Sequence, residues 1–109
     1  MKLCPRKDGN HAAVVEALRL HGWSVADTAS LGGGFPDLVV GKGKLNLLLE
    51  VKDGGLSPSR RRLTEDEAVF HHGWRGTVVT VLGPDDAVAK CRTVLELATI
   101  KGYLEKLCG

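Results

Sequence analysis

The chain has 109 residues, 43% of them hydrophobic, and a formal net charge of +2. This length predicts a single domain spanning residues 1–109 with one hydrophobic core. No apolar run approaches the ~20 residues that cross a bilayer, and the N-terminal MKLCPRKDGN lacks the apolar segment of a secretory signal, so we expect a cytoplasmic protein without membrane contact. The net charge is too small to indicate nucleic-acid binding by itself.

The first predicted elements are a helix and a short strand. We expect the helix to begin near His11, with Asp8 or Asn10 as its cap, because apolar residues recur from there at helical spacing. Gly22 should end this helix. The alternation in WSVAD then predicts a strand over residues 23–28.

A β-hairpin is predicted after the glycine-rich loop 29–36. Its strands, over residues 38–40 and 45–52, flank the turn GKGK, whose glycines suit a hairpin. LNLLLEV in the second strand is apolar at nearly every position. We therefore expect this strand to lie in the centre of the sheet and to be covered on both faces.

The second half of the chain predicts a helix, a strand and further helix. After the loop 53–62, Thr64 and Glu67 have the spacing of a capping box for a helix that runs through His72. The remaining predicted elements are a strand over 77–82, a helix from Asp85 or Asp86 to about Ala98, and a short helix near 101–107. The order α-β-β-β-α-β-α predicts an α/β domain, in which helices flank a mixed β-sheet.

Three charged residues at the hairpin form the candidate site. If the hairpin is centred between the first lysine and the second glycine of GKGK, Asp37 lies opposite Leu48 and diagonally from Glu50, at roughly 7–8 Å. Lys52 follows two residues after Glu50, so both side chains share this face of the sheet.

The chemistry of this set favours a divalent metal. Two carboxylates close together raise each other's pKa, which makes their burial unfavourable without a cation. Mg²⁺ prefers carboxylate oxygen and keeps several waters, and a neighbouring lysine could position a metal-bound water or offset negative charge. Pro-Asp is also common in turns and Glu-x-Lys can be a solvated ion pair, but their combination on one hairpin face favours the metal site.

Basic residues near the hairpin are candidates for binding DNA phosphates. Arg60, Arg61 and Arg62 run together in the loop after the second strand, and Lys42 and Lys44 lie in the hairpin turn. Such clusters are often only solvated loops, so they support a nucleic-acid partner without establishing one.

The aromatic and histidine residues have more ordinary interpretations. We expect Trp23 and Trp74 in the core, although tryptophan can also stack on bases. The adjacent His71 and His72 point about 100° apart on a helix, so one should pack and the other should be exposed. His11 is expected at a helix end, with a contact to phosphate or to the active site as the alternative.

FPD followed by LLLEVK resembles the PD-(D/E)XK nuclease superfamily, and in particular the small stand-alone VRR-NUC proteins, many of them carried by phages. The resemblance covers most of the chain and extends to DGNHAAVVEALRLHGWSV, RRLTEDEAVFHHGWRGTVVTV and PDDAV in the same order. It implies a single nuclease domain with the restriction-endonuclease-like fold, a mixed sheet flanked by helices.

The resemblance also implies roles for individual residues. Asp37, Glu50 and Lys52 would be catalytic, and Asp37 and Glu50 would bind Mg²⁺ together with the carbonyl of Val51. Mn²⁺ would substitute for Mg²⁺. Relatives often carry glutamine at the position of Glu67. Here Glu67 is either a capping-box residue only or, like His11, a residue that would support the metal ligands without binding the ion.

The first helix departs from the family pattern. Relatives usually carry a metal-binding glutamate at the position that corresponds to Ala13. Glu16 lies one turn later and is a candidate substitute, but the helical pattern turns it toward solvent. This departure concerns the number of bound metals and the level of activity more than the fold.

The function implied by the resemblance is a Mg²⁺-dependent DNA endonuclease that hydrolyses phosphodiester bonds. It would be structure-selective for branched DNA such as a Holliday junction and act as a homodimer in a bacterial or phage-infected host cell. An alternative is a catalytically weak or inactive DNA-binding module of the same fold, and a weaker one is an assembly protein whose carboxylates only stabilise the fold. The apolar stripes around residues 95–107 are candidates for the dimer surface.

Overall fold

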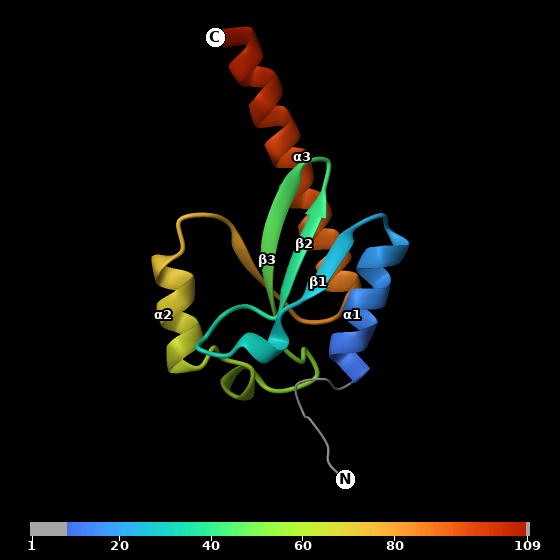
Figure 1. Cartoon of the computed structure of the whole chain (residues 1–109). Coiled ribbons are helices and arrows are strands. Elements are labelled where there is room, and N and C mark those ends of the chain that lie inside the picture. Colours follow the sequence, from blue (N-terminus) through green and yellow to red (C-terminus); the bar gives the residue numbers. More distant parts are fainter. Residues whose placement is uncertain (1–8, 109) are drawn as a thin grey trace.

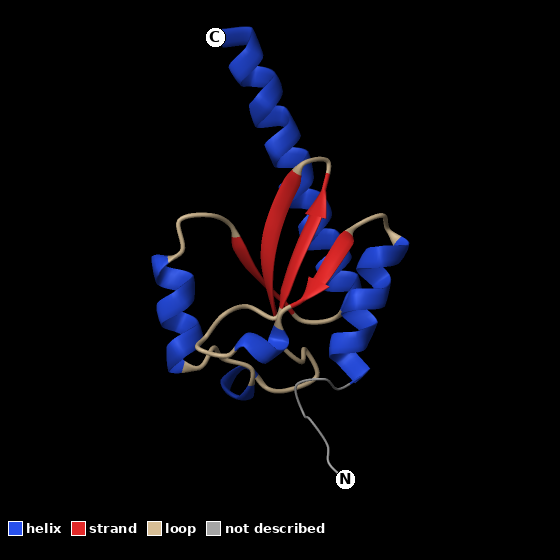
Figure 2. Cartoon of the chain, in the orientation of Figure 1, coloured by secondary structure: helices blue, strands red, loops and turns tan. Residues whose placement is uncertain are grey.

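A four-stranded mixed sheet forms the centre of the computed structural model, which describes residues 9–108 (Figures 1 and 2). The first and second strands are antiparallel, as are the second and third, and the third and fourth are parallel. In sheet order the strands are β1 (Ser24–Asp27), β2 (Leu38–Lys42), β3 (Leu45–Val51) and β4 (Val78–Val81).

Three helices complete the order α-β-β-β-α-β-α, which confirms the predicted α/β class. They are α1 (Gly9–Leu20), α2 (Glu65–Gly73) and α3 (Pro84–Cys108). Among the described residues, no helix is both long and apolar enough to cross a membrane.

The hydrophobic core lies between the sheet and two of its helices. Residues of β2 and β3 that are two apart share a face, and on one face they join side chains of α1 and α3 in a single buried cluster. Its most buried members are Val14, Leu18, Leu38, Val40, Leu47, Leu49, Val81, Ala87 and Cys91. The central position predicted for LNLLLEV is confirmed, because β3 pairs on both sides. Both of its faces are covered over residues 47–50, whereas Asn46 is exposed.

The other face of β2 and β3 carries the charged residues. Asp37, Glu50 and Lys52 alternate with the core-facing positions, so the same period of two that buries Leu49 in the core turns Glu50 toward α2. Val51 packs against the core cluster on the opposite side, as expected.

The hairpin turn lies one residue later than predicted. Lys42 pairs with Leu45, so the two turn residues are Gly43 and Lys44, whose φ angles are 59° and 70°. Positive φ at both central residues is the geometry of the tight turn that matches the twist of a hairpin. The prediction missed this turn because it did not place a lysine in the left-handed region, which residues with a Cβ rarely adopt.

The later turn changes which residues face each other across the hairpin. Leu38 pairs with Leu49, so the next step of the ladder places Asp37 opposite Glu50 and not opposite Leu48. A shift of two residues keeps every side chain on its predicted face. The two carboxylates are therefore closer than the predicted diagonal arrangement.

Three local predictions were wrong. The C-terminal helix α3 is continuous through Gly102, because one glycine in a helix interior costs only about 1 kcal/mol relative to alanine and need not end it. Asn10 lies inside α1 and is not its cap, and Asp8 lies outside the described residues. Trp74 is 44% exposed and stacks on Phe70, whereas Trp23 is buried in the core as predicted.

Candidate functional site

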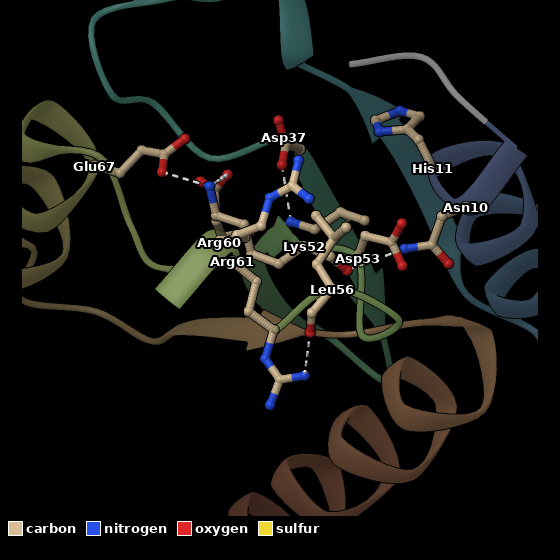
Figure 3. Close-up of a pocket in the computed structure, with 11 residues that line it drawn as sticks. Asn10, His11, Asp37, Lys52, Asp53, Leu56, Arg60, Arg61 and Glu67 are labelled. Atoms are coloured by element: carbon tan, nitrogen blue, oxygen red, sulfur yellow. Dashed lines mark hydrogen bonds and ion pairs between the residues drawn. The ribbon is translucent and has the colours of Figure 1, made fainter. Parts of the chain in front are cut away.

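A polar cavity of about 170 Å³ lies where β2 begins and β3 ends (Figure 3). Side chains reach it from α1, from both central strands, from α2 and from the loop after β3. The charged residues that line it are His11, Asp37, Glu50, Lys52, Asp53, Arg60, Arg61 and Glu67. The structure therefore brings the predicted set of Asp37, Glu50 and Lys52 to one cavity, beside two of the predicted arginines.

Asp37 is held in place by backbone groups. Its Oδ2 accepts a hydrogen bond from the backbone N–H of Val51 at 2.8 Å, and its carbonyl accepts one from the N–H of Thr28, also at 2.8 Å. The residue is 9% exposed. These contacts fix the carboxylate at the start of β2, facing the end of β3.

Glu50 is the most buried charged residue of the site, with 1% of its surface exposed. Burial, followed by hydrogen bonding and charge from Asp37 and then by Glu67, raises the pKa of Glu50 to about 9. Its Oε1 has no hydrogen-bond partner among the described residues. An unpaired buried acceptor costs roughly 1–3 kcal/mol, so this oxygen has a strong preference for a proton or a cation.

His71 faces the unpaired oxygen of Glu50. The His71 Nε2 atom lies 3.9 Å from Glu50 Oε1 and, within the part of the chain that the structure describes, it also has no hydrogen-bond partner. Burial lowers the pKa of His71, and the Lys52 charge adds to this effect against the opposing influence of Glu67. The imidazole is therefore neutral at physiological pH, and this contact is not an ion pair.

Lys52 is oriented by Glu67. The Lys52 Nζ atom donates to Glu67 Oε1 at 2.7 Å and lies 3.9 Å from Glu50 Oε2. Glu67 Oε1 also accepts from the N–H of Thr64, which completes the capping box of α2. Burial alone would raise the pKa of Glu67, but the bonds from Lys52 and Thr64 lower it overall. Glu67 thus serves in the capping box and also contacts Lys52.

The first helix contributes Asn10 and His11 to the cavity. Asn10 Nδ2 donates to the carbonyl of Lys52 at 3.0 Å, and His11 Nε2 lies 3.1 Å from Asp27 Oδ2. Glu16 is exposed and lines a separate groove on the outer side of α1. The structure therefore does not bring Glu16 to the carboxylate pair, because it lies more than one turn further along the helix than the residues that face the site.

The predicted phosphate-binding residues separate into two groups. Arg60 and Arg61 line the cavity, and Arg61 Nη1 also donates to the carbonyls of Gly54 and Leu56, both at 3.1 Å. Lys42 ends β2 and Lys44 lies in the hairpin turn, at the opposite end of the β2–β3 pair (Figure 1).

Lys42 and Arg62 do not line the cavity. Lys42 Nζ donates to the carbonyl of His21 at 2.7 Å, and Arg62 is exposed. The five basic residues therefore do not form one surface.

Sequence reasoning missed the roles of Asn10 and His71. Asn10 looked like a helix cap, and its contact with Lys52 spans 42 residues, so no local pattern indicates it. His71 had a signal in the sequence: it follows Glu67 by four residues, which places both side chains on the same face of α2.

The donor set fits a hard divalent cation that retains waters. Among residues 9–108, no group of three or more His, Cys, Asp or Glu side chains is arranged to hold a metal ion. The available protein ligands are the carboxylates of Asp37 and Glu50, with the backbone of Val51 in the same cavity wall. Mg²⁺ commonly binds one or two carboxylates and keeps several waters, and the unpaired Oε1 of Glu50 is an oxygen that such an ion would satisfy.

In comparisons with known proteins, the chain matches no protein-family model, no curated protein and no solved structure. The geometry of the cavity and the sequence motifs at the β2–β3 hairpin are therefore what support a function for this chain.

Proposed function

We propose that this protein is a Mg²⁺-dependent DNA endonuclease that hydrolyses phosphodiester bonds, selects branched duplex DNA and acts as a homodimer. One observation carries the proposal: the buried Oε1 of Glu50 lacks a hydrogen-bond partner among the described residues, next to Asp37 and within a cavity that also contains an ammonium group. Buried side-chain acceptors are normally hydrogen-bonded, so this unpaired oxygen supports a bound cation at the Asp37–Glu50 pair.

The residues of the cavity divide into two roles. Asp37 and Glu50 would hold Mg²⁺ or Mn²⁺ together with the carbonyl of Val51, and the bound ion supplies Lewis-acid stabilisation and a water of lowered pKa. Lys52, oriented by Glu67, places its ammonium within 3.9 Å of Glu50. There it would stabilise the negative charge that develops on a phosphoryl group during attack.

The size and charge of the cavity support the phosphodiester backbone as the bound group. Its volume of about 170 Å³ is below the roughly 300–1,000 Å³ of pockets that enclose small molecules. Arg60 and Arg61 on its wall would contact phosphates, which gives affinity without sequence selectivity. The preference for branched DNA rests on the resemblance to VRR-NUC proteins.

Cleavage of a labelled four-way DNA junction tests the proposal. Wild type should cut the junction with Mg²⁺ or Mn²⁺ and not with EDTA, and Asp37→Asn and Lys52→Ala should each reduce the rate by at least 100-fold, since each removes a group at the reacting phosphate. Lys44→Ala, at the far end of the hairpin, is the matched control and should cut at the wild-type rate.

A DNA-binding module without efficient catalysis is the second candidate. It is favoured by the absence, within residues 9–108, of a third metal-binding side chain, at the place where the resemblance predicts a helix glutamate and the sequence has Ala13. Tight junction binding with no cleavage in either metal would favour this candidate over the nuclease.

A further inference from the structure

The C-terminal half of α3 extends beyond the rest of the molecule. The helix is 25 residues long, and the core cluster with its packed neighbours includes α3 residues only up to Leu95. The remaining turns project past the sheet in Figure 1 and contribute to a longest dimension of 56 Å, against 31 Å and 25 Å for the other two. None of the described elements covers the large apolar side chains of this projecting segment.

Four large apolar residues form a stripe along the projecting segment. Leu97, Ile100, Leu104 and Leu107 are each between 52% and 65% exposed. Their spacings of three, four and three residues are those of the two inward-facing positions of a coiled-coil heptad. A stripe with this spacing fits a second helix better than a flat or concave partner.

The stripe faces away from the body of the molecule. Cys91 marks the buried side of α3, and Ile100 follows it by nine residues, which corresponds to a rotation of about 180° at ~100° per residue. A helix packed against Ile100 and its neighbours would therefore not collide with the sheet of its own chain. Two copies joined through this stripe would carry their bodies on opposite outer sides.

We propose that two copies of this chain pair through the stripe as a parallel, in-register two-helix coiled coil. With the four apolar residues at the inward-facing heptad positions, Glu96 and Lys101 occupy the flanking positions that face each other across a parallel pair. Each copy would place Glu96 against the partner's Lys101, which gives two opposite-charge contacts. An antiparallel pair centred on the same stripe would instead bring the two Lys101 side chains together.

This interface gives the proposed homodimer a surface, and it depends on α3 alone, so the activity of the cavity does not bear on it. The seam spans only about two heptads, fewer than the three or four of a self-sufficient coiled coil. We therefore expect a reversible dimer with a Kd on the order of micromolar.

Analytical ultracentrifugation of the full chain tests the surface. Wild type should shift from monomer to dimer as its concentration rises through about 1–100 μM. Ile100→Glu combined with Leu104→Glu should leave a monomer with an unchanged circular dichroism spectrum, because both side chains are exposed. Thr99→Glu combined with Lys106→Glu, on another face of the same turns, should still dimerise. A wild type that stays monomeric, or a dimer that survives the Ile100 and Leu104 changes, would overturn the proposal.

Disulfide cross-linking tests the orientation. In a background with Cys4→Ser and Cys108→Ser, Leu107→Cys should form a dimer on mild oxidation, and Lys106→Cys should not. Burial raises the pKa of Cys91 to about 11, so this remaining thiol stays unreactive near neutral pH. Cross-linking between chains carrying Leu97→Cys and chains carrying Leu107→Cys, with none between two Leu107→Cys chains, would show an antiparallel pair and contradict the proposed register.

Discussion

Glu50 connects the packing of the sheet to the chemistry of the cavity. The alternation of β3 that buries Leu49 in the core also forces Glu50 into a space with 1% exposure, against Asp37 and close to neutral His71. Burial and the neighbouring carboxylates raise its pKa to about 9. The metal-free protein therefore carries a protonated Glu50 at neutral pH, and an incoming cation must displace that proton.

The stability of the metal-free protein should fall as the pH rises. The pKa of Glu50 is higher in the folded chain than the 4.5 of the unfolded chain, so its contribution to folding is complete below about pH 4.5 and is lost as the pH approaches about 9. Since one pKa unit corresponds to ~1.4 kcal/mol, the free energy of unfolding in EDTA should drop across this range by on the order of a few kcal/mol. Urea titrations at several pH values would measure it.

Glu50→Gln is the variant that isolates this effect, because glutamine keeps the shape and does not titrate. Its free energy of unfolding should stay nearly flat over the same pH range. Glu16→Gln, on the exposed surface of α1, should follow the wild-type curve. A wild-type slope that persists in Glu50→Gln would assign the pH dependence to other groups.

At the scale of single residues, the sequence predicted which residues of the hairpin lie together but not which helix residues join them. Asp37, Glu50 and Lys52 follow from alternation along two neighbouring strands, which is a local property. Asn10 and His71 reach the site from helices whose packing against the sheet no local pattern specifies. The positions of Asn10 and His71 therefore depend on long-range packing, which the spacing of residues in the sequence does not specify.

The N-terminal capping box of helix α2 includes Glu67, which also contacts Lys52 in the cavity. Thr64 accepts from the N–H of Glu67 at 3.2 Å, and the Glu67 side chain that returns to the N–H of Thr64 also binds Lys52. Thr64 thereby holds the Glu67 carboxylate in place, and this carboxylate in turn orients Lys52. The capping box was predictable from its spacing, but its second function was not, since it depends on where β3 ends.

Thr64→Ala should affect stability and activity together. Loss of an N-cap side chain typically costs about 1 kcal/mol, and here it also loosens Glu67, so cleavage should fall by several-fold beyond what unfolding explains. Thr93→Ala removes a hydroxyl from the exposed middle of α3 and should change neither quantity by more than about 0.5 kcal/mol. Equal effects of the two substitutions would mean that the cap does not influence the site.

The elements themselves were largely predictable, and their errors have definite causes. The turn position depended on Lys44 adopting a φ of 70°, which the sequence does not favour. The continuity of α3 depended on Gly102 lying inside a helix whose earlier turns are anchored in the core. In both cases the context of the fold outweighed a local preference.

At the scale of the whole molecule, the basic residues have different surroundings at the two ends of the sheet. Arg60 and Arg61 lie on the cavity wall, whereas Lys42 and Lys44 lie at the far end of the hairpin. The sequence placed all of them near the hairpin but could not show that the hairpin's length separates them. Under the proposed function, we therefore expect only the arginines to contact the DNA phosphates at the cavity.

Removing Arg60 should weaken junction binding at every sequence and reduce the slope of log Kd against log salt by about 1. Lys44→Ala removes the same charge from the hairpin turn and should leave the slope unchanged. Fluorescence anisotropy at several salt concentrations would compare them. A larger effect from Lys44→Ala would place the DNA on the other end of the sheet.

The most direct test of the central claim is calorimetric titration of the full chain with Mn²⁺. We predict saturable binding to wild type that releases protons and strengthens as the pH rises, and its loss in Glu50→Gln and Asp37→Asn proteins that remain folded. Equal Mn²⁺ binding by wild type and both variants, or none by wild type, would contradict a metal site at the Asp37–Glu50 pair.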